Sequence, residues 1–260
     1  MRSRFRVVVP LLAGLAAVAF VSPGASASVW TRTEPTGAVT ISAASSLTEA
    51  FGAIGKQFEK RYTGTDVTFN FDASSALVLQ IQGGAPVDVF ASADEANMDK
   101  LVSGGQVAVK PVDIAQNKLE IAVKPGNPEK VGTLADLADV GVVALCAPEV
   151  PCGKYADAAL ADAGVTIPPY KITRGPNARA TLTAVSAGDA DAAIVYVTDV
   201  KAAGKSVTGA RIPNAQNQTA IYPIAPLAGA ANPATAKAFA KYVASPAGEK
   251  ILRKFGFLPA

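Results

Sequence analysis

From Ala38 onward, short apolar segments alternate with longer amphipathic ones, and this alternation limits the folds open to the chain. Apolar residues follow helical spacing between Leu47 and Tyr62, whereas the neighbouring runs are short and typical of strands. Strand–helix alternation predicts a parallel α/β sheet with helices on both faces. The predicted strands are 39–42, 67–71, 87–91, 119–123, 142–145, 192–196 and 221–227, and the predicted helices are 46–62, 77–81, 95–101, 134–138, 155–163, 178–187, 234–244 and 247–255.

Two of the predicted strand-to-helix junctions carry the same tripeptide, Ala-Ser-Ser, at 44–46 and 73–75. Ser46 and Glu49 also match a capping box. Such serines can simply cap a helix, but the unpaired N–H groups of a helix start also suit an anion. Two further junctions, 151–153 and 175–178, offer mainly backbone N–H groups. Because ligands of open α/β sheets bind beyond the carboxyl ends of the strands, these four junctions predict an anion site.

The first 27 residues have the layout of a secretory signal peptide. Three arginines precede an apolar stretch over 7–21, and small residues at 25–27 form a cleavage signature. The apolar stretch is short for a membrane span, and an uncleaved N-terminal anchor stays open as the alternative. No cysteine lies near the cleavage point, which disfavours a lipoprotein. We therefore expect a protein exported to the periplasm, the cell envelope or the medium, with residues 28–37 as a flexible leader.

The apparent basicity of the chain comes from this signal. The sequence has 24 basic and 21 acidic residues, and the signal carries Arg2, Arg4 and Arg6. Without these three the charges balance, so nothing favours binding to nucleic acid or to a membrane surface.

The contents of histidine and cysteine narrow the chemistry further. Histidine is absent, which excludes Ser-His-Asp and Cys-His catalysis and histidine metal sites. The close pair Cys146 and Cys152 predicts a disulfide in an exported protein, with two free, partly buried thiols as the alternative. Two thiols make a poor metal site, so we expect no bound metal cation and no cofactor.

Six segments of the chain form a distinctive series: SAASSLTEAF (42–51), NFDASSALVLQIQGGAPVDVFASAD (70–94), VPCGKYADAAL (150–160), NARATLTAV (177–185), AAIVYVTDV (192–200) and FAKYVASPAGEKILRKFGF (239–257). Together, in this order and spacing, they resemble the molybdate-binding protein of the ABC-type molybdate importer. The resemblance implies a two-lobed periplasmic-binding-protein fold of type II, with the lobes joined by crossing hinge strands. It places residues 38–117 and 223–260 in lobe 1 and residues 118–222 in lobe 2, with the ligand trapped between them by a hinge motion.

The resemblance also implies a ligand set. The family's molybdate contacts fall on the hydroxyls and N–H groups of Ser46 and Ser74, the N–H groups of Cys152 and Ala178, and the hydroxyl of Tyr196. Tyr196 can alternatively be a core tyrosine that ends a buried strand. Tungstate is expected to bind as molybdate does. A membrane permease and its ATPase are the expected partners, and the protein is expected to be a monomer that catalyses no reaction.

The chemistry of such a site is coherent without the family. A fully deprotonated dianion only accepts hydrogen bonds, so neutral donors satisfy it. Phosphate keeps a proton near neutral pH, and a site built only from donors leaves that proton unpaired at a cost of about 1–3 kcal/mol. Asp72 is the one nearby acceptor, and we expect it to face solvent or to cap locally.

Three alternatives stay open at this point. The same scaffold can bind another tetrahedral oxyanion, such as sulfate or phosphate. An exported hydrolase with Ser46 or Ser74 as its nucleophile would need a base, and no Ser-x-x-Lys pattern begins at either serine. A purely structural envelope domain would leave the four junctions unexplained.

Overall fold

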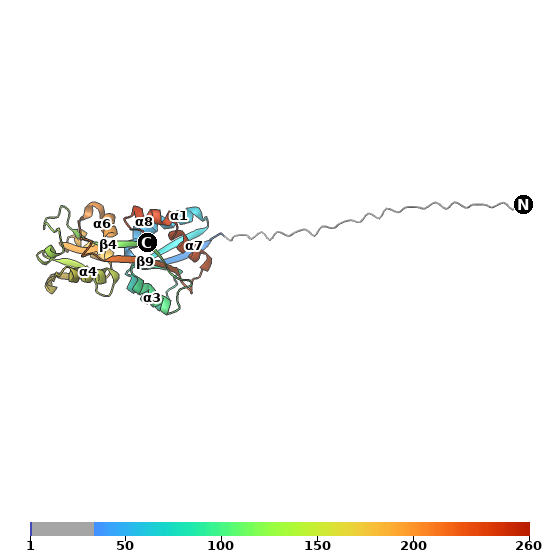
Figure 1. Cartoon of the computed structure of the whole chain (residues 1–260), viewed down its shortest axis with the longest axis horizontal. Coiled ribbons are helices and arrows are strands. Elements are labelled where there is room, and N and C mark those ends of the chain that lie inside the picture. The colour runs from blue at the N-terminus through green and yellow to red at the C-terminus, as the bar shows by residue number, and fades with distance from the viewer. Residues whose placement is uncertain (2–33) are drawn as a thin grey trace. The chain divides into compact units, whose positions relative to one another are not determined.

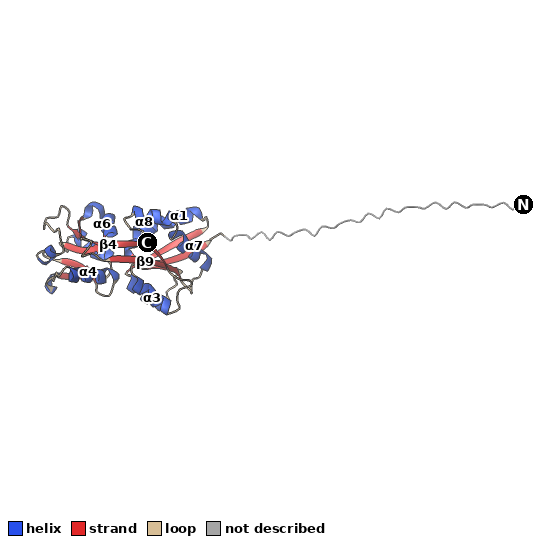
Figure 2. Cartoon of the chain, viewed as in Figure 1, coloured by secondary structure: helices blue, strands red, loops and turns tan. Residues whose placement is uncertain are grey.

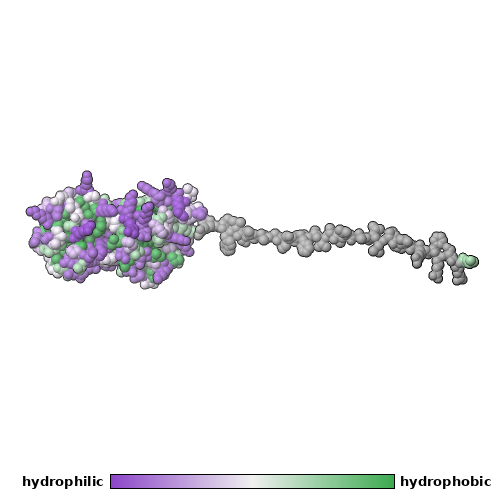
Figure 3. Space-filling model, turned by 45° about the horizontal axis from the view of Figure 1, so that its top comes forward, coloured by the Kyte–Doolittle hydropathy of each residue, from purple (hydrophilic) through white to green (hydrophobic). Residues whose placement is uncertain are grey.

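The structure is a computed structural model that describes Met1 and residues 34–260. Apart from Met1, the predicted signal peptide lies outside the described residues, as does most of the predicted leader. Residues 34–260 form one compact unit. None of its helices is both long and apolar enough to cross a membrane. Hydrophilic residues cover much of the face seen in Figure 3, with hydrophobic residues interspersed among them.

Strands and helices alternate along the chain as predicted (Figures 1 and 2). The strands are β1 (Gly37–Ala44), β2 (Thr65–Asp72), β3 (Val89–Ala91), β4 (Val112–Val123), β5 (Val143–Cys146), β6 (Ile172–Gly175), β7 (Ala192–Tyr196), β8 (Thr208–Arg211) and β9 (Thr219–Pro226). The α-helices are α1 (Thr48–Arg61), α2 (Ser74–Gln82), α3 (Glu95–Ser103), α4 (Pro151–Asp162), α5 (Ala178–Ala187), α6 (Val197–Ala203), α7 (Pro233–Val243) and α8 (Pro246–Lys254). Short 3-10 turns are η1 (Ser45–Leu47), η2 (Ala135–Ala138), η3 (Pro169–Lys171) and η4 (Gly204–Ser206).

Two parallel groups of strands form the outer parts of the sheet. The strand order is β2-β1-β3-β9-β4-β7-β5-β6, and β8 also pairs with β4. Within one group β1 runs parallel to β2 and β3, and within the other β5 runs parallel to β6 and β7. The predicted parallel α/β sheet is therefore confirmed, with β4 and β9 as antiparallel strands between the two groups.

The long strand β4 joins two lobes. Up to Lys118 it pairs with β9, and from Leu119 onward it pairs with β7 and β8. The first lobe consists of β1, β2, β3 and β9, the start of β4, and helices α1, α2, α3, α7 and α8. The second lobe consists of the end of β4, β5 to β8, and helices α4, α5 and α6, and both β4 and β9 lie where the two lobes meet (Figure 1). The exact boundaries at 117/118 and 222/223 remain predictions.

The first lobe has an aromatic core beneath α1. Phe51, Ile54 and Phe58 are fully buried on the apolar face of that helix, and Phe239 of α7 contacts both phenylalanine rings edge-on. The amphipathic pattern predicted for 46–62 is thus confirmed. Its first turn is different, because η1 precedes α1 and residue Leu47 stands at the N-cap of α1.

The predicted capping box at Ser46 is wrong. No side chain caps η1 or α1, and the Ser46 hydroxyl instead lies 2.8 Å from the Tyr222 hydroxyl. The Glu49 carboxylate, the other half of the predicted box, pairs with Arg179 of the second lobe. The two side chains that the local pattern assigned to the helix start, Ser46 and Glu49, instead make tertiary contacts.

Candidate ligand-binding site

All five predicted ligand residues line one cavity between the two lobes. Ser46 and Ser74 come from the first lobe, and Cys152, Ala178 and Tyr196 come from the second; all five are buried. The remaining lining residues are Ala44, Ser45, Asp72, Ala73, Ala93, Val150, Pro151 and Asn177. The cavity volume is about 10 Å³, on the order of the space that one buried water needs. Any ligand larger than a water molecule, an oxyanion included, would require the lobes to separate.

The cavity is surrounded by helix starts. Ser74, Cys152 and Ala178 lie within the first two residues of α2, α4 and α5. The first N–H groups of a helix have no partner inside it, and no side chain caps α2 or α4. Asn177 caps α5, but it accepts the N–H of Ala180 and not that of Ala178. The four junctions predicted from the sequence therefore meet at one place, as the carboxyl ends of the strands require.

Neither serine acts as a helix cap. The Ser74 hydroxyl oxygen accepts the N–H of Ala93 at 2.9 Å, and the Ser46 hydroxyl oxygen lies 2.8 Å from the Tyr222 hydroxyl. One lone pair of the Ser74 oxygen accepts this protein hydrogen, and the hydroxyl proton has no protein acceptor among the described residues, so it is available to a ligand. The local prediction of a capping role is wrong, and its failure strengthens the prediction of an anion site.

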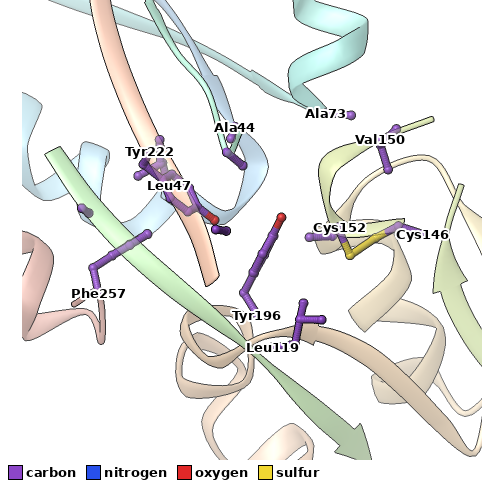
Figure 4. Packing of buried hydrophobic residues seen from close by; sticks show 14 of the residues in the cluster. Ala44, Leu47, Ala73, Leu119, Cys146, Val150, Cys152, Tyr196, Tyr222 and Phe257 are labelled. Carbon is purple, nitrogen blue, oxygen red and sulfur yellow. A yellow bond between two sulfur atoms is a disulfide. The ribbon is translucent and has the colours of Figure 1, made fainter. Parts of the chain in front are cut away.

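Tyr196 presents a hydroxyl without a protein partner. Among the described residues it is the one buried side-chain nitrogen or oxygen that makes no hydrogen bond, and the residue is 2% exposed. Figure 4 shows this hydroxyl directed into the space between Ala44, Ala73 and Cys152. Burial raises the pKa of the Tyr196 phenol well above its usual value, so the group stays a neutral donor. An unpaired buried hydroxyl is costly unless a ligand or water accepts its proton.

A disulfide holds the start of α4. Cys146 at the end of β5 is bonded to Cys152, as the sequence predicted (Figure 4). The next residue, Gly153, packs so closely that a Cβ there would lie 2.0 Å from the carbonyl oxygen of Ala147. Only glycine fits this approach, which sets the position of the Cys152 N–H group.

Three polar pairs join the lobes close to the cavity. Glu49 pairs with Arg179, the Asn177 amide donates to the Asp72 carboxylate at 2.9 Å, and Lys154 lies 3.8 Å from Asp94. The same Asp72 oxygen also accepts the N–H of Ala73 at 2.7 Å. Asp72 makes a local contact, but it lines the cavity, which differs from the expectation that it faces solvent or caps locally, and its contact with Asn177 across the lobes was not predicted.

The donors in the cavity are neutral. No lysine, arginine or histidine lines it, and the described residues contain no cluster of three or more metal-ligating side chains. The one strongly perturbed carboxyl nearby is Asp199, which accepts the N–H of Tyr196 at 3.1 Å. Burial raises the pKa of Asp199 to about 7.

Sequence reasoning missed the residues behind the ligand set. Tyr222 of β9 contacts Ser46, and Asn117 of β4 contacts Tyr222. No local pattern marks either residue, because Tyr222 lies inside a predicted core strand and Asn117 lies just before the strand predicted at 119–123. Asp199 follows Tyr196 by three residues and lies in the first turn of α6, a helix that the sequence did not predict, so no local signal marked it.

Comparisons with known proteins agree with this geometry. The family model of bacterial extracellular solute-binding proteins matches residues 39–258. The chain is 38% identical over 249 residues to the molybdate-binding protein ModA of Mycobacterium tuberculosis, and this alignment covers 95% of this chain and 94% of that relative. It is 34% identical to the ModA of Escherichia coli over 85% of this chain and 89% of that relative.

Solved structures share the two-lobed fold. The periplasmic molybdate-binding protein of Azotobacter vinelandii superposes with a TM-score of 0.77 at 21% identity, over 85% of this chain and 99% of that one. The sulfate-binding protein SubI of Mycobacterium tuberculosis gives a TM-score of 0.77 at 20% identity, over 86% and 87%. The periplasmic-binding-protein fold predicted from the sequence is confirmed. The chain belongs to the family of bacterial extracellular solute-binding proteins, which includes these molybdate-binding relatives.

Proposed function

We propose that this protein captures molybdate, or tungstate, in the cavity between its lobes and delivers it to an ABC importer. The proposal depends chiefly on the Tyr196 hydroxyl, which is buried and has no hydrogen-bond partner among the described residues. It is directed into the space between Ala44, Ala73 and Cys152 (Figure 4). The proposed contacts are the hydroxyls and N–H groups of Ser46 and Ser74, the N–H groups of Cys152 and Ala178, and the Tyr196 hydroxyl. The names of the relatives support molybdate as the ligand.

The polarity of these groups favours a fully deprotonated anion. Every proposed contact is a neutral donor, and the oxygen of Asp72 that faces Asn177 already accepts two hydrogens. A ligand that keeps a proton, such as monohydrogen phosphate, would meet only donors at the proposed contacts, at a cost of about 1–3 kcal/mol, and the second carboxylate oxygen of Asp72 is the competing acceptor in the lining. Sulfate has the same charge as molybdate and differs mainly in size, so it is the closest competing ligand.

We also propose that the lobes separate to admit and release the ion. The boundary near 117/118 is supported by the change of partner of β4 between Lys118 and Leu119, and the return crossing by the pairing of β9 from Thr219 onward. A membrane permease and its ATPase would receive the ion from an exported, monomeric protein. The serine-hydrolase alternative has little support, because the Ser46 and Ser74 hydroxyls contact Tyr222 and the Ala93 N–H and no base.

Calorimetric titration of residues 28–260 with molybdate, tungstate, sulfate and phosphate tests the proposal. We expect one site per chain with sub-micromolar molybdate and tungstate binding and much weaker sulfate and phosphate binding. If sulfate binds more tightly than molybdate, the protein is instead a sulfate-binding protein on the same scaffold, as the shared fold of the sulfate-binding protein SubI suggests. No binding of any of the four anions would refute an oxyanion-binding function.

A further inference from the structure

A chain of hydrogen bonds lies behind Ser46, outside the cavity lining. The Tyr222 hydroxyl is 2.8 Å from the Ser46 hydroxyl oxygen, and the Asn117 amide nitrogen lies 3.4 Å from the Tyr222 hydroxyl. The same amide nitrogen donates to the Thr198 hydroxyl at 2.8 Å. Tyr222 and Asn117 are buried, and neither lines the cavity.

The direction of this chain is determined at Asn117. Its side-chain oxygen accepts the backbone N–H of Lys118 at 3.0 Å, so the orientation of the amide is set and its nitrogen faces Tyr222 and Thr198. An amide nitrogen only donates. The Tyr222 oxygen therefore accepts from Asn117, and among the described residues the Ser46 oxygen is the one acceptor within reach of the Tyr222 proton, from which we infer that Tyr222 donates to Ser46. Ser46 accepts that proton, which leaves its own proton for the cavity.

We propose that Asn117 and Tyr222 are positioning residues that commit the Ser46 hydroxyl to donate to the bound oxyanion, and that they thereby set the discrimination against protonated oxyanions. The proposal rests on the function proposed above. Ser74 is committed in the same way by the backbone, because its oxygen accepts the N–H of Ala93. With one lone pair of each serine engaged on the protein side, each hydroxyl directs its own proton toward the cavity. Polarisation along such a chain also strengthens the final hydrogen bond.

The ring of Tyr222 allows a clean test. It packs edge-on against Tyr196 and Phe257 with centroids 6.1 Å and 5.2 Å away, and Tyr222→Phe keeps this packing while it removes the hydroxyl. Tyr242→Phe is the matched control, because Tyr242 is a half-buried tyrosine of α7 that packs on Phe58 and contributes nothing to the cavity.

The experiment measures the Kd for molybdate, and the competition of inorganic phosphate against bound molybdate at pH 7, for the wild type and both variants. For Tyr222→Phe we expect molybdate affinity to fall about tenfold, as for the loss of one hydrogen bond of about 1.4 kcal/mol. Phosphate should compete better relative to molybdate, because the Ser46 hydroxyl is then free to turn its proton away and present its oxygen to the phosphate proton. Tyr242→Phe should match the wild type in both readouts.

Three results have distinct meanings. If phosphate competes no better against Tyr222→Phe than against the wild type, the positioning role is refuted, whatever the change in stability. If Tyr222→Phe does not fold, Asn117→Ala takes its place, since it leaves the Tyr222 hydroxyl free to turn away from Ser46; an unchanged phosphate competition there refutes the proposal equally. A wild type that binds no oxyanion refutes the proposed function itself, before either variant is compared.

Discussion

The two halves of the cavity present their donors in different ways. In the first lobe, Ser46 and Ser74 use side chains whose oxygens are already engaged by Tyr222 and by the Ala93 N–H. In the second lobe, Cys152 and Ala178 offer backbone groups at helix starts, and Tyr196 offers a hydroxyl with no protein partner. The first half is thus completed by the protein, whereas the second half is left to be completed by a ligand.

This difference predicts how each half responds to change. If the proposed contacts hold, the first half depends on side-chain identity, because each serine there would serve both the protein and the ligand. The second half depends on backbone conformation, which Gly153 and the disulfide hold at Cys152. Four predictions test this difference between the two halves of the cavity, beginning with the largest expected effect.

Replacing both first-lobe serines should have the largest effect. In Ser46→Ala with Ser74→Ala, two hydrogen bonds to a charged ligand are lost at about 1.5–3 kcal/mol each, which lowers molybdate affinity by at least about 100-fold. Calorimetry measures this loss, and circular dichroism checks the fold. Ser75→Ala, a half-buried neighbour outside the cavity, is the control and should bind as the wild type does. A double variant that still binds within tenfold would contradict the proposed contacts of the first half.

The free energy of unfolding should depend on pH through Asp199, which contacts Tyr196 in the second half of the cavity. The Asp199 carboxyl accepts a hydrogen bond from the Tyr196 N–H. Burial raises the pKa of this carboxyl from an ordinary value near 4 to about 7. Between these values the unfolded chain binds fewer protons than the folded one, so the free energy of unfolding falls as pH rises from about 4 to about 7. At about 1.4 kcal/mol per pKa unit, the total change is on the order of 4 kcal/mol.

Denaturant unfolding of the wild type and Asp199→Asn over this pH range isolates that contribution. The asparagine variant should lack it, while Asp189→Asn, a change at an exposed carboxylate, should retain it. Equal pH profiles for the wild type and Asp199→Asn would show that Asp199 is ionised throughout the range in the folded protein.

Tyr196→Phe separates a ligand contact from a core tyrosine. We expect molybdate affinity to fall by about 10- to 150-fold, for a loss of about 1.5–3 kcal/mol. The stability of the ligand-free protein should stay unchanged or rise slightly, because the removed hydroxyl has no partner among the described residues. Thermal unfolding without and with molybdate measures both. A large loss of ligand-free stability would instead favour a structural role.

Reduction of the disulfide should have the smallest effect on binding. It leaves the Cys152 N–H in place but loosens its loop, so affinity should fall by less than about tenfold and stability by about 2 kcal/mol. Titration with and without a reductant measures the change, and the double variant Cys146→Ser with Cys152→Ser should not respond to the reductant. Unchanged affinity in the fully reduced protein would contradict the proposed role of the bridge.

Local pattern predicted most of the fold and missed its short elements. The helix over 46–62 and the strand over 192–196 were predictable because burial on one face or on both leaves a clear periodicity. The elements β6, α6 and β8 were missed, since four to seven residues with mixed exposure carry little periodic signal. Residues 134–138, predicted as a helix, form the short 3-10 turn η2.

The same limit applies to the site. The Ala-Ser-Ser junctions and the glycines pointed to helix starts that suit an anion, and the family resemblance added the ligand residues. The partners of those residues could not be predicted, because the hydrogen bonds from Ser46 to Tyr222 and from Tyr222 to Asn117 span 176 and 105 residues of sequence. The wrong capping box at Ser46 has the same origin, since a distant hydroxyl competed with the local backbone.

The sequence by itself determined the α/β alternation, the close cysteine pair and the absence of histidine, because each of these depends on residue type or on short spacing. Only the tertiary structure decided which way the donors face. It engaged Ser46 and Ser74 with protein partners, brought helix starts from two lobes to one cavity and left the Tyr196 hydroxyl unpaired within the described residues. The direction of a hydroxyl proton depends on its neighbours in space, and those neighbours come from strands that the sequence keeps far apart.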